Sequence, residues 1–300
     1  MLKQFSDELS KIAINSQKYV THLKLHTTHN GGVASGIVCK DDGIIITNQH
    51  VIDSVKSIDV TLSNGEVYSA TVIGEDKFTD LAILHIDQSH LPTPQFANSD
   101  VLSLGQVVLA LGNPLDFQLS ITMGIISGLN RSIPNKLGRL MNNMIQTDAA
   151  LSPGSSGGPL LDIDGRIIGI NTAIIIGVAQ GLSFTIPSNT VTWVSSTLLK
   201  EGVIIRGFLG VAGETIAGNP QTIGSDNQVL RVTGIAKGSP ADGVIRYGDH
   251  ILSIDEKRIK TFDDISKMLN KDTIGKLTKI EIIRDNTIIK DSFTPTKLIL

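Results

Sequence analysis

The sequence predicts a mainly β protein built from two domains, residues 1–200 and 201–300. Its 300 residues, 41% of them hydrophobic, are enough for one large core or two smaller ones, and cores stop growing at about this size. Residues 19–186 consist of short Val/Ile/Leu/Thr runs separated by Gly and Asn/Asp turns. A spacing of about 8–12 residues between such runs is typical of a β-sandwich or barrel.

Two helices are expected at the ends of the first domain. Apolar residues at helical spacing predict a short amphipathic helix over residues 2–15, which would pack one face and expose the other. Residues 187–200 combine cap residues with a single apolar stripe, so they are expected to form a closing helix. Glu201 and Gly202 then begin the linker to the second domain.

The second domain is expected to be small and rich in β-structure, with one main helix. Thr261 and Asp264 form a capping pattern that leads into a helix near residues 262–270. Two apolar runs flank Asp285 and Asn286, and this pattern predicts a final β-hairpin. Strand-like runs account for most of the remaining residues, which makes this an α+β domain.

Composition argues against several classes of function. The formal net charge is −3 and the basic residues are scattered, so neither nucleic acid nor an anionic membrane is favoured as a partner. A single cysteine, Cys39, excludes an intrachain disulfide and a multi-cysteine metal site, and it is expected to be an unreactive strand residue. No stretch reaches the roughly 18 apolar residues of a membrane span.

The start of the chain has no apolar run of the length that a secretory signal requires. The protein is therefore expected in the cytoplasm. A mature form whose leader has been removed would look the same, so a location outside the cytoplasm stays open.

The histidines outside the main motifs are candidate metal ligands. A helix could present two of His22, His26 and His29 to a metal, but the apolar residues around them indicate a strand edge, so a solvated face is favoured. His85 and His90 are expected at the surface. The sequence therefore predicts no metal site and no cofactor.

Three segments carry the residues that acyl transfer from a peptide requires: a nucleophile, a base, an orienting carboxylate and N–H donors for an oxyanion. Ser156 lies in a glycine-rich turn, where the N–H groups of Gly154 and Ser156 are the expected oxyanion hole. His50 ends an apolar strand-like run, and Asp80 directly precedes another. The order His, Asp, Ser is that of chymotrypsin-like proteases.

Each motif alone has an alternative explanation. The Gly-x-Ser-x-Gly pattern of residues 154–158 also fits the nucleophile elbow of α/β-hydrolases. That fold needs a helix after the serine and then Asp before His, whereas here a β-like run follows and the only later histidine is His250. Taken singly, His50 is more often a structural histidine and Asp80 a cap, but the three motifs together favour catalysis.

The segments around these residues resemble the motifs of HtrA/DegP-type serine proteases. The matches run in family order along most of the chain: residues 47–52, 79–82, 112–114, 148–160 and 181–187. Two departures are Ser155, where the family usually has Asn, and a short loop between His29 and Gly36. The resemblance implies a chymotrypsin-like double six-stranded β-barrel in which His50 is the general base, Asp80 orients it and Ser156 is the nucleophile.

The resemblance also implies a substrate pocket. In chymotrypsin-like folds the residue six before the nucleophile lies at the base of the S1 pocket, and here it is Ala150, followed by Leu151. Neither side chain carries a charge. The sequence therefore predicts cleavage after small or medium aliphatic residues.

Residues 206–211 resemble the carboxylate-binding loop of HtrA-type PDZ domains, and residues 238–242 and 248–254 match further parts in order. Such domains bind extended peptides at a sheet edge and hold the terminal carboxylate with backbone N–H groups. The expected peptide-binding residues are Phe208, Leu209, Gly210 and Val211. A domain that serves only for packing is the alternative.

As a whole, the resemblance implies a serine endopeptidase that degrades unfolded or damaged proteins, binds peptide C-termini through its PDZ domain, and assembles as a homo-trimer or larger oligomer. The alternative is a peptide-binding chaperone or scaffold in which proteolysis is latent or secondary. The catalytic residues alone do not show whether their loops are ordered for activity.

Overall fold

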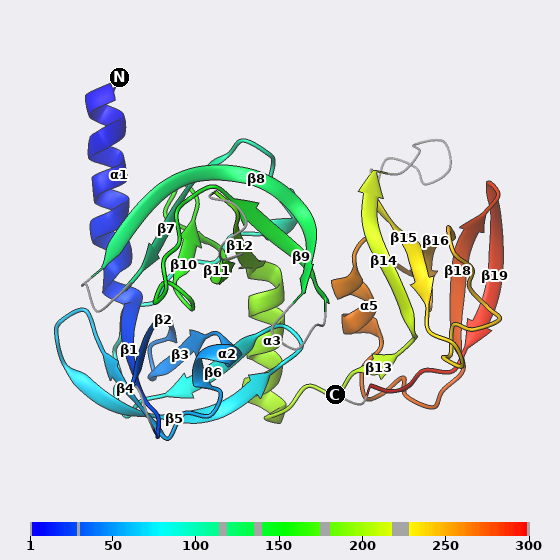
Figure 1. Cartoon of the computed structure of the whole chain (residues 1–300), viewed down its shortest axis with the longest axis horizontal. Helices are drawn as coiled ribbons and strands as arrows, with labels where there is room; N and C mark the ends of the chain where they lie inside the picture. The colour runs from blue at the N-terminus through cyan, green and yellow to red at the C-terminus, as the bar shows by residue number, and fades with distance from the viewer. Residues whose placement is uncertain are drawn as a thin grey trace. The chain divides into compact units, whose positions relative to one another are not determined.

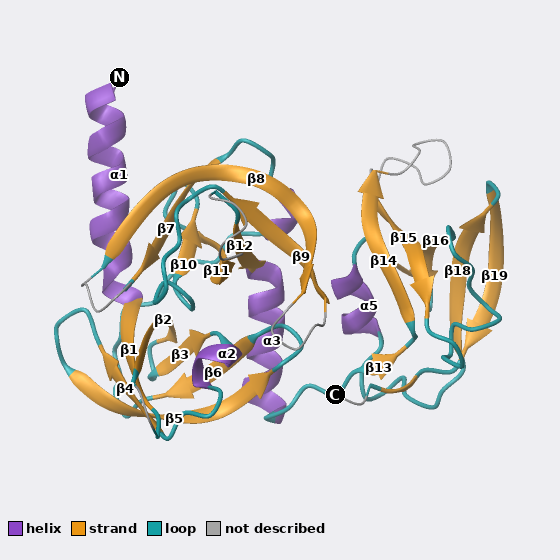
Figure 2. Ribbon diagram, in the orientation of Figure 1, coloured by secondary structure: helices purple, strands orange, loops and turns teal. Residues whose placement is uncertain are grey.

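The computed structural model describes residues 2–28, 31–113, 119–134, 140–174, 181–217 and 228–298. Its ribbon is shown in Figures 1 and 2. His29, one of the histidines considered as a metal ligand, and Pro114, part of a matched motif, lie outside the described residues. The chain divides into two compact units, Met1–Arg131 with Met144–Val203 and Ser132–Asn143 with Ile204–Leu300. The expected division into domains of residues 1–200 and 201–300 stays a prediction.

The first half of the first unit is a closed antiparallel barrel (Figure 1). Its strands are β1 (Val20–His26), β2 (Gly32–Lys40), β3 (Ile44–Thr47), β4 (Ser57–Thr61), β5 (Val67–Asp76) and β6 (Leu81–His85), in the order β1-β2-β3-β6-β5-β4. Branched apolar side chains suit a pleated surface, and several of them fill the barrel. Fully buried examples are Leu23, Ile37, Ile45 and Ile83.

A second closed barrel follows along the chain. Its strands are β7 (Val107–Gly112), β8 (Ser120–Pro134), β9 (Leu140–Thr147), β10 (Pro159–Leu161), β11 (Ile167–Ile174) and β12 (Ser183–Pro187), in the order β10-β11-β12-β9-β8-β7. Val108, Ile126, Ile145 and Leu160 belong to its apolar core. The two barrels confirm the double six-stranded architecture that the motifs predicted.

The helices at the ends of this unit also form as predicted. These are α1 (Leu2–Ser16) and α3 (Ser188–Glu201), the latter ended by Gly202 in a left-handed conformation. Short 3-10 helices η1 (Gln17–Tyr19) and η2 (Ser99–Val101) and the α-helix α2 (Gln49–Ile52) complete the unit. No helix among the described residues has the length and apolar character needed to cross a membrane.

The expected packing of the N-terminal helix was wrong for its first two turns. Leu2 is 85% exposed and Phe5 is 41% exposed, although both belong to the apolar stripe. Only the later members of the stripe, such as Leu9 and Ile12, are half-buried. The apolar period is therefore correct, but the first half of the stripe is left exposed to solvent.

The second unit contains a small β-sheet with one main helix (Figure 2). Its elements are β13 (Gly207–Phe208), β14 (Val211–Ala217), β15 (Gln228–Ile235), β16 (His250–Ile254), β17 (Lys257–Arg258), α5 (Phe262–Met268), β18 (Thr278–Arg284), β19 (Thr287–Phe293) and β20 (Thr296–Lys297). Thr261 and Asp264 form the predicted capping box of α5. Asp285 and Asn286 both adopt positive φ in the predicted hairpin turn, as a type I′ turn requires.

Candidate active site

His50 and Asp80 come from neighbouring parts of the first barrel. The sequence placed His50 at the end of a strand-like run. In the structure, strand β3 already ends at Thr47, and His50 lies in the short helix α2. Asp80 directly precedes β6 and has a φ of 59°, a left-handed conformation in which Asp and Asn are enriched. The carboxylate of Asp76 stabilises this turn by accepting bonds from the N–H and hydroxyl of Thr79.

The imidazole of His50 is held by the carboxylate of Asp80. Nδ1 of His50 lies 2.7 Å from Oδ2 and 2.9 Å from Oδ1 of Asp80, and the backbone N–H of His50 donates to Oδ1 at 2.8 Å. A carboxylate can only accept, so Nδ1 carries the proton. In the neutral ring, Nε2 then has the free lone pair, and this is the form of histidine that acts as a base.

The backbone of Asp80 is fixed as firmly as its side chain. Its carbonyl accepts from the side-chain amide of Asn48 at 3.0 Å and from the N–H of Gln49 at 3.1 Å. Asp80 is only 6% exposed. The carboxylate is therefore shielded from water while several donors compensate its burial.

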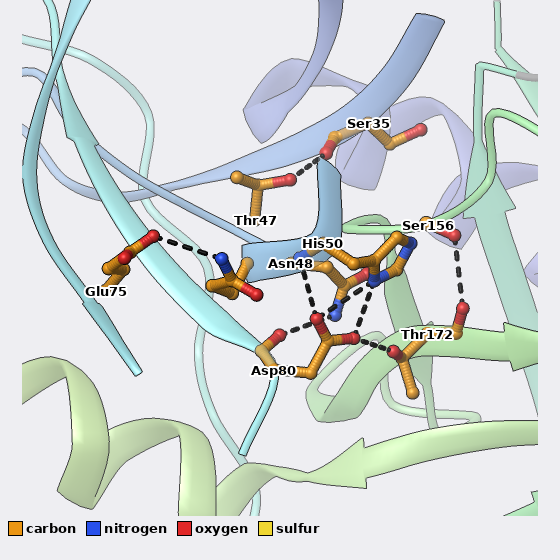
Figure 3. Close-up of polar contacts among 9 residues, drawn as sticks. Ser35, Thr47, Asn48, His50, Glu75, Asp80, Ser156 and Thr172 are labelled. Carbon is orange, nitrogen blue, oxygen red and sulfur yellow. Dashed lines mark hydrogen bonds and ion pairs between the residues drawn. The ribbon is translucent and has the colours of Figure 1, made fainter. Parts of the chain in front are cut away.

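Ser156 comes from the second barrel, in the turn that precedes β10. In Figure 3 its side chain lies beside the ring of His50, next to the nitrogen that faces away from Asp80. In this structure the hydroxyl donates to the carbonyl oxygen of Thr172 at 3.1 Å. Catalytic hydrogen bonds are often formed only when substrate is bound, and a rotation of the hydroxyl would aim it at the ring.

Thr172, on β11, is a site residue that the sequence analysis missed. Its hydroxyl donates to Oδ2 of Asp80, and its carbonyl oxygen accepts the hydroxyl of Ser156. It therefore contacts both the carboxylate from the first barrel and the serine from the second (Figure 3). A single threonine in a strand gives no signal of such a role. Thr172 and Asp80 are 92 positions apart in the sequence, and only the folded structure brings them into contact.

The turn around Ser156 leaves two backbone N–H groups without an acceptor among the described residues. Ser155 donates to the carbonyl of Ser152 at 2.9 Å, Gly157 to that of Asn171 at 2.9 Å, and Gly158 to that of Ser155 at 3.1 Å. Within the described parts of the chain, the N–H groups of Gly154 and Ser156 have no such partner. These two are the donors that the sequence selected for an oxyanion hole.

The predicted S1 residues lie just before this turn. Ala150 is exposed, and its carbonyl accepts from the hydroxyl of Thr122 at 2.7 Å. Leu151 is half-buried against the core of the second barrel. The nearest preceding acid, Asp148, uses Oδ1 to accept the N–H of Ile125 at 2.7 Å.

The predicted peptide-binding loop lies in the second unit. The side chain of Leu209 is 3% exposed and packs in the core, so this residue offers a ligand its backbone only. A Cβ at Gly210, whose φ is 87°, would lie 2.1 Å from Cβ of Ser239, so only glycine fits. Among the residues that the structure describes, the N–H groups of Leu209 and Gly210 have no acceptor. Phe208 lies in β13 and Val211 begins β14.

The other titratable candidates lie apart from this site. Nε2 of His26 is 2.8 Å from a carboxylate oxygen of Asp59, which accounts for that histidine. The described residues contain no group of three or more His, Cys, Asp or Glu side chains placed to hold a metal. Burial raises the pKa of the Cys39 thiol to about 12, so the thiolate needed for reactivity is scarce at neutral pH.

Comparisons with known proteins agree with both units. Residues 34–170 match the family model described as a trypsin-like peptidase domain, and residues 207–291 match that of the PDZ domain. The structure named HtrA-type protease AlgW with tripeptide is 31% identical, with a TM-score of 0.76 over 99% of this chain and 98% of that one. The serine endoprotease from Yersinia pestis is 29% identical, with a TM-score of 0.67 over 96% of this chain and 97% of that one.

Curated proteins are also similar to this chain in sequence. A probable periplasmic serine endoprotease, DegP-like, from Chlamydia trachomatis is 36% identical over 270 residues, which are 88% of this chain and 54% of that protein. The serine protease Do-like HtrA of Bacillus subtilis is 36% identical over 85% of this chain and 61% of its own length. The chain thus spans about half the length of the curated relatives it matches.

Proposed function

This chain belongs to the HtrA family of serine proteases, and on that premise we propose that it is a serine endopeptidase that works through an acyl-enzyme. The observation that carries the proposal is the bond of 2.7 Å from Nδ1 of His50 to the buried carboxylate of Asp80, on the opposite side of the ring from Ser156. This arrangement fixes the ring as a base for the serine hydroxyl.

In the proposed mechanism, Nε2 of His50 removes the proton of Ser156 as the serine oxygen attacks the peptide carbonyl. The resulting oxyanion accepts the N–H groups of Gly154 and Ser156, and His50 then delivers its proton to the leaving amine. A water molecule then attacks the acyl-enzyme in the same way, with His50 again as the base, and releases the second product. Asp80 and Thr172 do not touch substrate; Asp80 holds the imidazole and Thr172 holds Asp80.

A fluorophosphonate probe tests the proposal directly, because it modifies only a serine made nucleophilic by its neighbours. We expect one equivalent of probe on Ser156, located by mass spectrometry of the digested protein. Heat-denatured protein is the control and should stay unlabelled. Label on Ser152 or Ser155, or none on the native protein, would contradict the assignment.

We propose that the S1 pocket accepts aliphatic side chains, since Ala150 and Leu151 bring no charge and the carboxylate of Asp148 is already bonded to the backbone of β8. Cleavage of a randomised peptide library, read by mass spectrometry, should therefore occur mainly after Val, Ala, Leu or Ile. Cleavage mainly after Lys or Arg would refute this pocket.

We further propose that the second unit binds peptide C-termini, with the N–H groups of Leu209 and Gly210 as donors to the carboxylate and Phe208 and Val211 beside them. Unfolded polypeptides are the proposed substrates, and a homo-trimer or larger oligomer is the proposed assembly. Since several relatives are named as periplasmic, a compartment outside the cytoplasm is proposed in place of the cytoplasm. A chaperone with latent proteolysis is not favoured, because the relatives are named as proteases.

A further inference from the structure

Ser35, on β2 of the first barrel, is fully buried, and four hydrogen bonds to described residues outside its strand ladder hold it. Its hydroxyl donates to the carbonyl of Gly154 at 2.8 Å and accepts the N–H of Asn113 at 2.8 Å. Its own N–H donates to the carbonyl of Ser156 at 2.9 Å, and its carbonyl accepts the hydroxyl of Thr47 at 2.8 Å. Figure 3 shows the carbonyl of Ser35 facing Thr47 while its hydroxyl points away.

Ser35 thus bonds to the carbonyls of Gly154 and Ser156, the two residues of the turn whose N–H groups have no acceptor within the described part of the chain. The peptide group between Gly154 and Ser155 is fixed at both ends, because Ser155 donates its N–H to Ser152 at 2.9 Å. Gly154 has a φ of 101°. Glycine adopts positive and negative φ about equally well, so the residue itself does little to keep this conformation. The restraint on this turn therefore comes from its partners rather than from the residue itself.

The contact between Ser35 and the turn is also close in space. A Cβ at Gly157 would lie 2.0 Å from the carbonyl oxygen of Ser35, and one at Gly112 would lie 3.1 Å from its hydroxyl oxygen. Nothing larger than glycine fits at residue 157, so the turn and β2 are tightly packed.

We propose that the hydroxyl of Ser35 is a positioning group for catalysis: it holds the peptide between Gly154 and Ser155 so that the N–H of Gly154 stays aimed at the oxyanion. The proposal rests on the proposed function. Because the same oxygen accepts from Asn113, it also ties the end of β7 to this turn. Ser35 touches neither substrate nor reacting atoms, so its effect passes through the turn alone.

The experiment compares Ser35→Ala with Ser188→Ala in the full chain. Ser188 is a matched control, since it is also fully buried and its hydroxyl also donates to a backbone carbonyl, that of Ala97 at 2.6 Å, away from the site. We expect Ser35→Ala to lower kcat on a chromogenic peptide by about 10- to 100-fold, with KM changed less than about threefold. Ser188→Ala should retain the wild-type kcat at temperatures below its unfolding transition.

A second readout separates positioning from general loosening. A peptide boronic acid forms a tetrahedral adduct with the serine, so its affinity should weaken by the same factor as kcat/KM in Ser35→Ala. The pH profile should keep its shape, because His50 and Asp80 are untouched. If Ser35→Ala does not fold by circular dichroism, Ser35→Cys, with a weaker donor of similar shape, is measured by the same criteria.

Three results would overturn the inference: a wild-type kcat in the Ser35 variant, a loss confined to KM, or an equal loss in Ser188→Ala. Failure of the proposed function itself has a different signature. In that case the wild-type protein neither cleaves peptides nor takes up fluorophosphonate on Ser156. Such a result would contradict both the proposed endopeptidase function and the proposed role of Ser35.

Discussion

Ser156→Ala is expected to abolish peptide hydrolysis, with kcat lowered by about 10⁵- to 10⁶-fold. Without the hydroxyl no acyl-enzyme can form, and only binding and the N–H groups of the turn remain to assist attack by water. The measurement is the rate of cleavage of a fluorogenic peptide at saturating substrate, together with the loss of fluorophosphonate labelling.

The fold should survive this change. The hydroxyl of Ser156 makes one hydrogen bond, to the carbonyl of Thr172, and Ser156 is only partly buried. Ser155→Ala is a suitable control, because it removes the hydroxyl next to Ser156 in the sequence. Among the described residues, the hydroxyl of Ser155 makes only a long contact of 3.4 Å with the N–H of Ser152. Substantial turnover by the Ser156 variant, with an unchanged thermal transition, would show that another residue is the nucleophile.

Asp80→Asn is expected to lower kcat by about 10⁴-fold while leaving the chain folded. The amide that replaces the carboxylate can donate to Nδ1 of His50, which moves the ring proton to Nε2 and leaves no lone pair for Ser156. Asn tolerates the left-handed conformation at this position, where φ is 59°. Pre-steady-state kinetics should show that acylation is slowed.

Thr172→Val serves as a graded comparison for the same carboxylate. It removes one donor to Asp80 but leaves the carboxylate and the bond to Nδ1 in place, so a loss of about tenfold is expected. Thr172→Ser should restore activity because it keeps the hydroxyl. If Asp80→Asn were no worse than Thr172→Val, the carboxylate would not be orienting the histidine.

Local patterns predicted most of the architecture. The apolar runs of both barrels, the capping box at Thr261 and the turn at Asp285 and Asn286 all depend on neighbours within a few residues, and each formed as expected. The four-residue helix that carries His50 was missed because it spans barely one helical turn, whereas a helical pattern is recognised over roughly 11–18 residues. The exposure of Leu2 depends on whether another part of the protein packs against the start of the helix. The apolar pattern of the helix alone does not predict this.

The residues that support the site were beyond local reasoning. Motifs identified His50, Asp80 and Ser156, and the fold brings these three side chains together (Figure 3). Thr172 and Ser35 sit in ordinary strand segments, and their partners Asp80 and Gly154 lie 92 and 119 positions away. Only the docking of one barrel against the other creates these contacts.

That docking has a consequence for the life of the protein. The base and its carboxylate belong to one barrel, while the nucleophile and the threonine that joins them belong to the other. Under the proposed mechanism, a chain still emerging from the ribosome cannot hydrolyse peptides until residue 172 has been made and both barrels have closed.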